Sequence, residues 1–150
     1  MNYKPYERGF TLVELILVIV ILGALTAAAL PRFVNLRADA KKASINGLAA
    51  SMRDAVVLVQ MKWLVVGNKS ASTVMLANGT TVGVGTGSGP NGGVPLASTT
   101  GIDRAAGIST TQYTCNNSPV RTCTLVGGPA TCAVIYNRNT GMVTTITTGC

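Results

Sequence analysis

Few side chains in this sequence could carry out chemistry. There is no histidine, and beyond residue 9 the only acidic side chains are Glu14, Asp39, Asp54 and Asp103. Neither a Ser-His base for nucleophilic catalysis nor a paired-carboxylate site is therefore available. We expect that the protein is not an enzyme and that it uses no cofactor.

Cysteine is the other reactive residue type, and the four cysteines all lie in the last quarter of the chain, at Cys115, Cys123, Cys132 and Cys150. They form no CxxC pair, and without histidine no metal site is expected. An even number of cysteines in a Thr- and Gly-rich segment predicts two disulfides formed in an oxidising compartment. Three connectivities are possible. A turn near Gly128 would place Cys123 almost opposite Cys132, so a set of 123–132 with 115–150 is one of them.

An apolar segment near the N-terminus, residues 10–30, carries a single carboxylate. As a helix its 21 residues would be about 31 Å long, enough to cross a hydrocarbon core. An ordinary membrane anchor and a secretory signal peptide are the alternative interpretations of this segment. A signal peptide is disfavoured because a helical pattern continues past the small residues before Pro31, where its cleavage would fall. Glu14 within the span costs on the order of a few kcal/mol and indicates a function, unless it reaches the interface about 6 Å away.

A family signature surrounds this carboxylate. Residues 8–15 read RGFTLVEL and are followed by the apolar run and Pro31, which resembles the prepilin signature of type IV pilins and their relatives. The resemblance implies that a prepilin peptidase cuts between Gly9 and Phe10 and then N-methylates Phe10. It also implies that Glu14 acts in filament assembly and that Pro31 loosens the helix. The short leader and the phenylalanine after the cut resemble the type IVa class.

By this resemblance the chain is a structural subunit of a type IV pilus, a filament assembled by helix packing for surface attachment, biofilm formation or motility. The implied partners are other copies of the chain, the prepilin peptidase/methyltransferase, the pilus assembly machinery, the inner membrane, and a host or abiotic surface. The chain is expected in the inner membrane with its C-terminal domain in the periplasm, and afterwards in the extracellular pilus. The positive-inside rule would place that domain in the cytoplasm, because basic residues follow the span. The cysteines and the cleavage motif indicate the opposite.

A rival in the same family is a type II secretion pseudopilin. Major pseudopilins usually carry an acidic calcium loop and lack disulfides, whereas this chain has one carboxylate side chain after Asp54 and four cysteines. Segments 93–102 and 132–150 are similar to mannose-sensitive haemagglutinin-type major pilins. The net charge of +7 is assigned to a solvated helix face, since no aromatic residues accompany the basic ones for stacking on nucleic acid. Nucleic acid is therefore not expected as a partner.

The rest of the sequence predicts an α+β fold of the kind found in pilins. We expect a long N-terminal helix whose hydrophobic half protrudes and whose amphipathic half packs on a small antiparallel sheet. Apolar residues recur every third or fourth position along this second half. They are Ile45, Leu48, Met52, Ala55, Val56, Val59 and Trp63. The helix should end at Gly67-Asn68, and Pro31 should kink or melt it.

Beyond the helix, residues 69–107 are expected to be a loop, with a flexible Gly-rich stretch. Strands are expected at 120–125, 131–136 and 142–147. The predicted division is a leader at 1–9, a hydrophobic helix at 10–30, an amphipathic helix at 31–67 and a disulfide-containing antiparallel domain at 68–150. The pilin resemblance favours Cys115–Cys123 with Cys132–Cys150, because many pilins close their C-terminal region with a disulfide and the last residue needs a tether.

Overall fold

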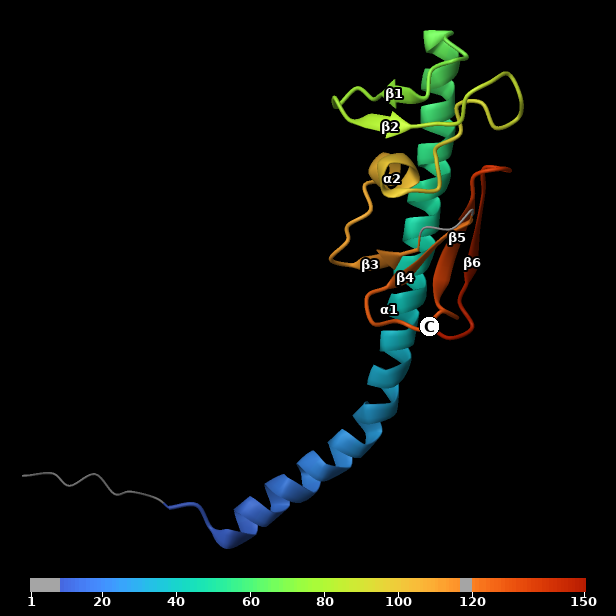
Figure 1. The fold of residues 1–150 in the computed structure, drawn as a ribbon. Helices are drawn as coiled ribbons and strands as arrows, with labels where there is room; N and C mark the ends of the chain where they lie inside the picture. Colours follow the sequence, from blue (N-terminus) through green and yellow to red (C-terminus); the bar gives the residue numbers. More distant parts are fainter. Residues whose placement is uncertain (1–8, 117–119) are drawn as a thin grey trace, which may run out of the picture. The chain divides into compact units, whose positions relative to one another are not determined.

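The computed structural model describes residues 9–116 and 120–150, and the side chains of residues 30–35 are not described. The predicted leader lies outside these residues except for Gly9. Two compact units are present, one up to Ala38 and one from Asp39 to Cys150. In chain order the described elements are α1 (Leu12–Val66), β1 (Thr73–Met75), β2 (Thr81–Gly83), the short π-type turn η1 (Thr99–Asp103), α2 (Arg104–Ala106), β3 (Tyr113–Cys115), β4 (Val120–Leu125), β5 (Ala133–Asn137) and β6 (Met142–Ile146) (Figure 1).

Helix α1 ends where the sequence predicts. Gly67 follows its last residue with a φ of 72°, a left-handed conformation that glycine adopts without a steric penalty. The Gly67 N–H donates to the carbonyl of Trp63 at 3.3 Å, which closes the last turn. The backbone is helical throughout residues 12–66, so the helix is not melted at Pro31. A proline removes one donor, and the neighbouring hydrogen bonds of a long helix hold the turn together. A kink at Pro31 stays a prediction.

The predicted apolar stripe on the second half of α1 is confirmed, because every one of its residues is buried. Its first part packs against the large sheet, where Ile45 and Met52 join Val134 and Tyr136 in one core cluster. Its last part forms a second cluster in which Trp63 packs against valines of β1 and β2. The spacing of three and four places all these side chains on one face of the helix, which explains why the sequence alone identified them.

The large sheet has the strand order β3-β4-β5-β6 and is antiparallel throughout (Figure 1). Its three C-terminal strands lie within about a residue or two of the predicted ranges, and β3 adds a fourth. Strand residues alternate, so Arg121, Cys123, Val134 and Tyr136 are buried while most of their neighbours are more exposed. The α+β architecture is therefore as predicted.

The segment 69–107 is not a simple loop, which corrects the prediction. It contains β1, β2, η1 and α2. These elements are three to five residues long, too short for a periodic pattern. They are stabilised by tertiary packing: β1, β2 and α2 contribute to the cluster around Trp63, and Ile102 of η1 contributes to the larger core cluster. The Gly-rich stretch is also partly buried, at residues 92–95. Gly93 has a φ of 75°, and a Cβ there would lie 2.9 Å from Trp63, so a close approach to this ring accounts for the glycine.

Candidate functional site: the N-terminal segment

The N-terminus of α1 is closed by a reciprocal hydrogen-bond arrangement between Thr11 and Glu14. The Glu14 N–H donates to Thr11 Oγ1 at 3.3 Å, while Glu14 Oε2 accepts from the Thr11 N–H at 3.3 Å and from the Thr11 hydroxyl at 3.1 Å. This is a capping box, in which the residue immediately before the helix and the third helical residue satisfy each other's unpaired backbone N–H donors. The carboxylate is therefore oriented within its own subunit, beside the partial positive charge of the helix N-terminus.

The role of Thr11 was missed by the sequence analysis, although a signal was present. The pattern Thr-x-x-Glu immediately before an apolar run is the sequence form of a capping box. Glu14 was interpreted as a charge inside a membrane span and as an assembly residue, and the structure adds that this charge has a local partner. Glu14 Oε1 has no hydrogen bond among the described residues, so one carboxylate oxygen is available to another group.

The residues flanking the predicted cleavage position are accessible. Gly9 and Phe10 precede the helix and are exposed, with Phe10 81% exposed. The peptide bond between them lies outside regular secondary structure, where a peptidase can bind an extended chain. A Cβ added at Gly9 would meet no atom within 4 Å, so the structure of the subunit itself does not require glycine here.

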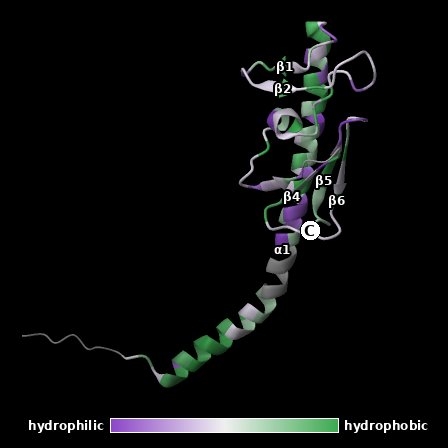
Figure 2. Cartoon of the chain, in the orientation of Figure 1, coloured by the Kyte–Doolittle hydropathy of each residue, from purple (hydrophilic) through white to green (hydrophobic). Residues whose placement is uncertain are grey.

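The first part of α1 is apolar around its whole circumference. The segment Leu12–Ala29 has a mean hydropathy of 2.7 and none of it is buried, and by length and composition it is the one described helix that could cross a membrane. Figure 2 shows the apolar colouring running along this segment. A helix that is apolar on all sides needs lipid or protein around it. The side chain of Pro31, the other predicted assembly residue, is not among those that the structure describes.

A second uncovered apolar surface lies on the other part of α1. Val57, Met61 and Leu64 are 49%, 59% and 61% exposed, and their spacing of four and three places them on one face. This outer face points away from the buried stripe that contacts the domain. Leu58 and Val65 extend it on one side. The domain therefore leaves part of its own helix open to a partner.

The four cysteines form the two disulfides Cys115–Cys123 and Cys132–Cys150. This is the pairing that the pilin resemblance favoured, and the alternative set is not formed. Cys115 lies opposite Cys123 in the β3–β4 register, which brings the two side chains together. Cys132 precedes β5 and its bond to Cys150 returns the chain end to the sheet, with the Gly149 N–H donating to the Thr131 carbonyl at 3.1 Å.

A buried ion pair lies beside the first disulfide, and sequence reasoning gave no sign of it. Arg121 Nε donates to Asp103 Oδ1 at 2.9 Å, and Arg121 Nη2 bonds the other carboxylate oxygen. Arg121 Nη1 donates to the Asn116 carbonyl at 2.9 Å. The exposed fractions are 1% for Arg121 and 7% for Asp103. The pair ties η1 to β4 through a bidentate contact.

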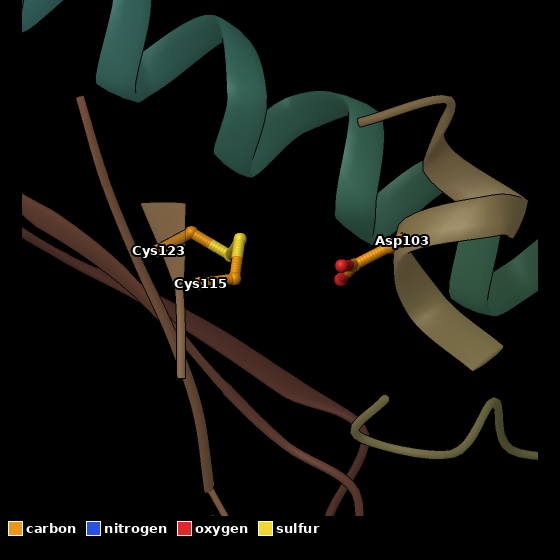
Figure 3. A group of neighbouring side chains, drawn as sticks. All are labelled: Asp103, Cys115 and Cys123. Carbon is orange, nitrogen blue, oxygen red and sulfur yellow. A yellow bond between two sulfur atoms is a disulfide. The ribbon is translucent and has the colours of Figure 1, made fainter. Parts of the chain in front are cut away.

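Asp103, Cys115 and Cys123 also form a cluster of potential metal ligands, with ligand atoms within 4.8 Å of one another. Figure 3 shows the Asp103 carboxylate directed toward the disulfide. The two sulfur atoms are bonded to each other and the carboxylate is neutralised by Arg121. Metal coordination needs thiolates and an available carboxylate, so this cluster does not fit a metal site in the oxidised protein.

Comparison with known proteins addresses the N-terminal segment. A model of the prokaryotic N-terminal methylation motif matches residues 4–30. The chain is 46% identical over 55 residues to the type IV narrow pilus major component PilA5 of Thermus thermophilus, a match that covers 37% of this chain and 47% of that protein. It is 44% identical over 41 residues to the type IV major pilin protein PilA of Myxococcus xanthus, covering 27% of this chain and 19% of that protein.

The matches cover about half of the first relative and about a fifth of the second. No solved structure matches the chain. The matched part contains the exposed Gly9-Phe10 junction, the capped Glu14 and the apolar first part of α1. Together, the methylation motif, the matches to two type IV major pilins and the α+β fold make the chain similar to type IV pilin precursors.

Proposed function

We propose that this protein is a structural subunit of a type IV pilus. It is held in the inner membrane as a precursor and then assembled through its N-terminal helix into an extracellular filament. The observation that carries the proposal is the wholly uncovered span Leu12–Ala29, which begins with a capped carboxylate. A surface of this size and composition is stable in lipid or in a protein core, and is strongly unfavourable in water.

Two uncovered apolar surfaces on one helix support polymerisation rather than simple anchoring. An anchor needs only the span, and the outer face containing Val57, Met61 and Leu64 would then remain exposed. In a filament this face can be covered by helices of other copies, and the span exchanges lipid for equivalent protein contacts. Apolar side chains at spacings of three and four are what helix-on-helix packing requires.

Processing completes the assembly surface. Cleavage between Gly9 and Phe10 by prepilin peptidase creates a positively charged amine on Phe10, which the same enzyme methylates. Inside a filament both this amine and the Glu14 carboxylate leave water, and each is costly to bury alone. The Glu14 of one subunit is proposed to meet the Phe10 amine of a neighbour, which sets the axial register. Pro31 is proposed to loosen the helix during assembly.

The pilus is favoured over a type II secretion pseudopilin by the two disulfides and by similarity to pilus subunits. Surface attachment and biofilm formation are the proposed roles of the filament. The proposed division of the chain is a leader at 1–9, an assembly helix at 10–30, an amphipathic helix at 31–67 and a globular domain at 68–150. The globular domain is proposed to lie in the periplasm before assembly.

The assembly step is tested with Glu14→Gln, which keeps the shape of the side chain and removes its charge. We expect normal cleavage and membrane insertion but few or no surface filaments, measured by electron microscopy beside a blot for the mature subunit. Asp39→Asn is the matched control, because it removes a carboxylate from the same helix outside the apolar span. Abundant filaments from the Glu14→Gln chain would mean that the charge does not set the register.

The processing step is tested separately with Gly9→Val. A Cβ at this position would meet no atom within 4 Å, so we expect the variant to fold normally and a loss of processing to report on the peptidase. We expect an uncut precursor in the membrane and no filaments. N-terminal sequencing that still began at Phe10 in this variant would contradict the proposed cleavage site.

A further inference from the structure

A trough on the C-terminal unit, lined by both polar and apolar groups, is not used by the proposed assembly. Two cavities of about 240 and 420 Å³ adjoin there, since both are lined by Thr99, Asp103, Ile108 and Thr110. One end of the trough reaches Asn78 and Thr80 beside β2, and the other end reaches Tyr113, Thr114, Cys115 and Arg121 on β3 and β4. Segments that are far apart in the sequence therefore line one concave surface.

The charged groups of the trough give it a positive balance. Asp103 and Arg121 form its buried ion pair, and Arg104 stands at the rim as a second guanidinium. Arg104 is exposed and uses Nη1 to donate to the Thr81 carbonyl at 3.0 Å. Its remaining N–H donors have no partner in the described part of the protein. A guanidinium held by one hydrogen bond and open on its other side suits a planar carboxylate.

The uncharged groups of the trough are rich in hydroxyls. Thr80, Thr99 and Thr110 line it, and their hydroxyl groups form no hydrogen bonds with the residues that the structure describes. Asp103 accepts two bonds from Arg121, and an ionised carboxylate has room for about two more. Tyr113 is half-buried at the far end, with its hydroxyl donating to the Ser44 carbonyl at 3.3 Å, so its ring is held in place.

We propose that this trough binds an acidic saccharide, with a uronate residue as its recognised unit. The uronate carboxylate pairs with Arg104, and its hydroxyl groups donate to Asp103 and bond the threonine hydroxyls. The apolar side of a neighbouring sugar ring lies against Tyr113. Hydroxyl, carboxylate, guanidinium and aromatic groups in one concavity are the ingredients of a site for a small polar ligand. A purely apolar ligand would leave the buried ion pair and the hydroxyls without solvation.

The test is a calorimetric titration of the full mature chain in detergent micelles with digalacturonate. Its neutral dimethyl ester and sodium sulfate serve as the other two ligands. We expect digalacturonate to bind at least about tenfold more tightly than either, because one charge-assisted contact corresponds to about that factor. An ester that binds equally well would show a neutral saccharide site, and sulfate that binds equally well would show simple anion binding. Either result overturns the proposal, as does the absence of digalacturonate binding.

Two variants locate the binding in the trough. Arg104→Gln is expected to raise the dissociation constant for digalacturonate about tenfold or more, and Thr110→Val to raise it severalfold. Arg138→Gln is the matched control, because it removes the same charge from an exposed residue outside the trough and should change the constant less than about twofold. Equal losses in the Arg104 and Arg138 variants would indicate non-specific attraction to a basic chain and would refute the site.

Discussion

Replacing Asp103 by asparagine would isolate one buried charge in the globular domain. The variant keeps the shape of the side chain but leaves Arg121, 1% exposed, without its counter-ion. Two hydrogen bonds from the guanidinium to the carboxylate become bonds to a neutral group or are lost. Hydrogen bonds to charged groups contribute about 1.5–3 kcal/mol each, and removing one partner of a buried pair typically costs about 3–5 kcal/mol. Because the new amide oxygen still accepts one bond, we expect a loss of about 3 kcal/mol, at the lower end of that range.

The measurement is urea unfolding of the full chain in detergent micelles, followed by fluorescence. Trp63 is the only tryptophan and is 4% exposed in the core of this unit, so it reports on unfolding of the domain. A loss of about 3 kcal/mol lowers the urea midpoint by roughly 1–3 M for an ordinary small-domain slope. This is a large part of the roughly 5–15 kcal/mol that stabilises a typical domain.

Two further variants make the reasoning refutable. Asp39→Asn breaks an exposed pair with Lys42, whose N–O distance is 4.0 Å, and should change stability by less than about 1 kcal/mol. The double variant Asp103→Leu with Arg121→Met removes both charges together and should be less destabilised than Asp103→Asn alone. A cost below about 1 kcal/mol for Asp103→Asn would show that the pair does not stabilise the domain.

Three other outcomes are expected. Thr11→Val removes the capping hydroxyl and should speed amide hydrogen exchange in the first turn of α1 about fivefold, equivalent to about 1 kcal/mol, whereas Thr11→Ser should leave the exchange rate unchanged. Unchanged exchange in the valine variant would argue against the capping box. Replacing both Cys132 and Cys150 by serine removes a disulfide with a sequence separation of 18 and should lower the free energy of unfolding by about 2–4 kcal/mol, measured by urea titration. A variant as stable as the unmodified chain would contradict this prediction. Burial raises the pKa of Tyr136 above its usual value of about 10, so the stability present below pH 10 is lost as the pH rises further. Tyr136→Phe should reduce this alkaline loss in the free energy of unfolding, measured by urea titration at several pH values. If the free energy of unfolding falls equally with pH in both proteins, the loss has another cause.

Much of the fold could be predicted because it depends on periodic patterns. The buried stripe of α1 and the boundary at Gly67 follow from residue spacing and from one glycine, which are local properties of the chain. The C-terminal strands were predicted as short segments separated by turns. The segment 69–107 was misjudged because its elements are too short to show a period, and they are stabilised by packing against the two core clusters.

The N-terminal segment and the Asp103–Arg121 ion pair differ in how far the sequence alone could reveal them. The predicted cleavage junction, Glu14 and the apolar span lie within one continuous segment, so residue order alone identified them as a group. The capping box was also readable from Thr11 and Glu14, three residues apart, although its role was overlooked. By contrast, Asp103 and Arg121 are separated by 18 residues and nothing in the intervening sequence links them.

The sequence by itself determined that this protein has a membrane-length apolar helix and a small disulfide-containing domain, because both depend on the type and spacing of nearby residues. Only the tertiary structure decided that the cysteines pair as 115–123 and 132–150, since spacing permitted three connectivities. It alone brought Asp103 to Arg121 and assembled the trough around them. The physical reason is that such contacts join distant segments, and a buried charge is tolerated only where folding places its counter-ion beside it.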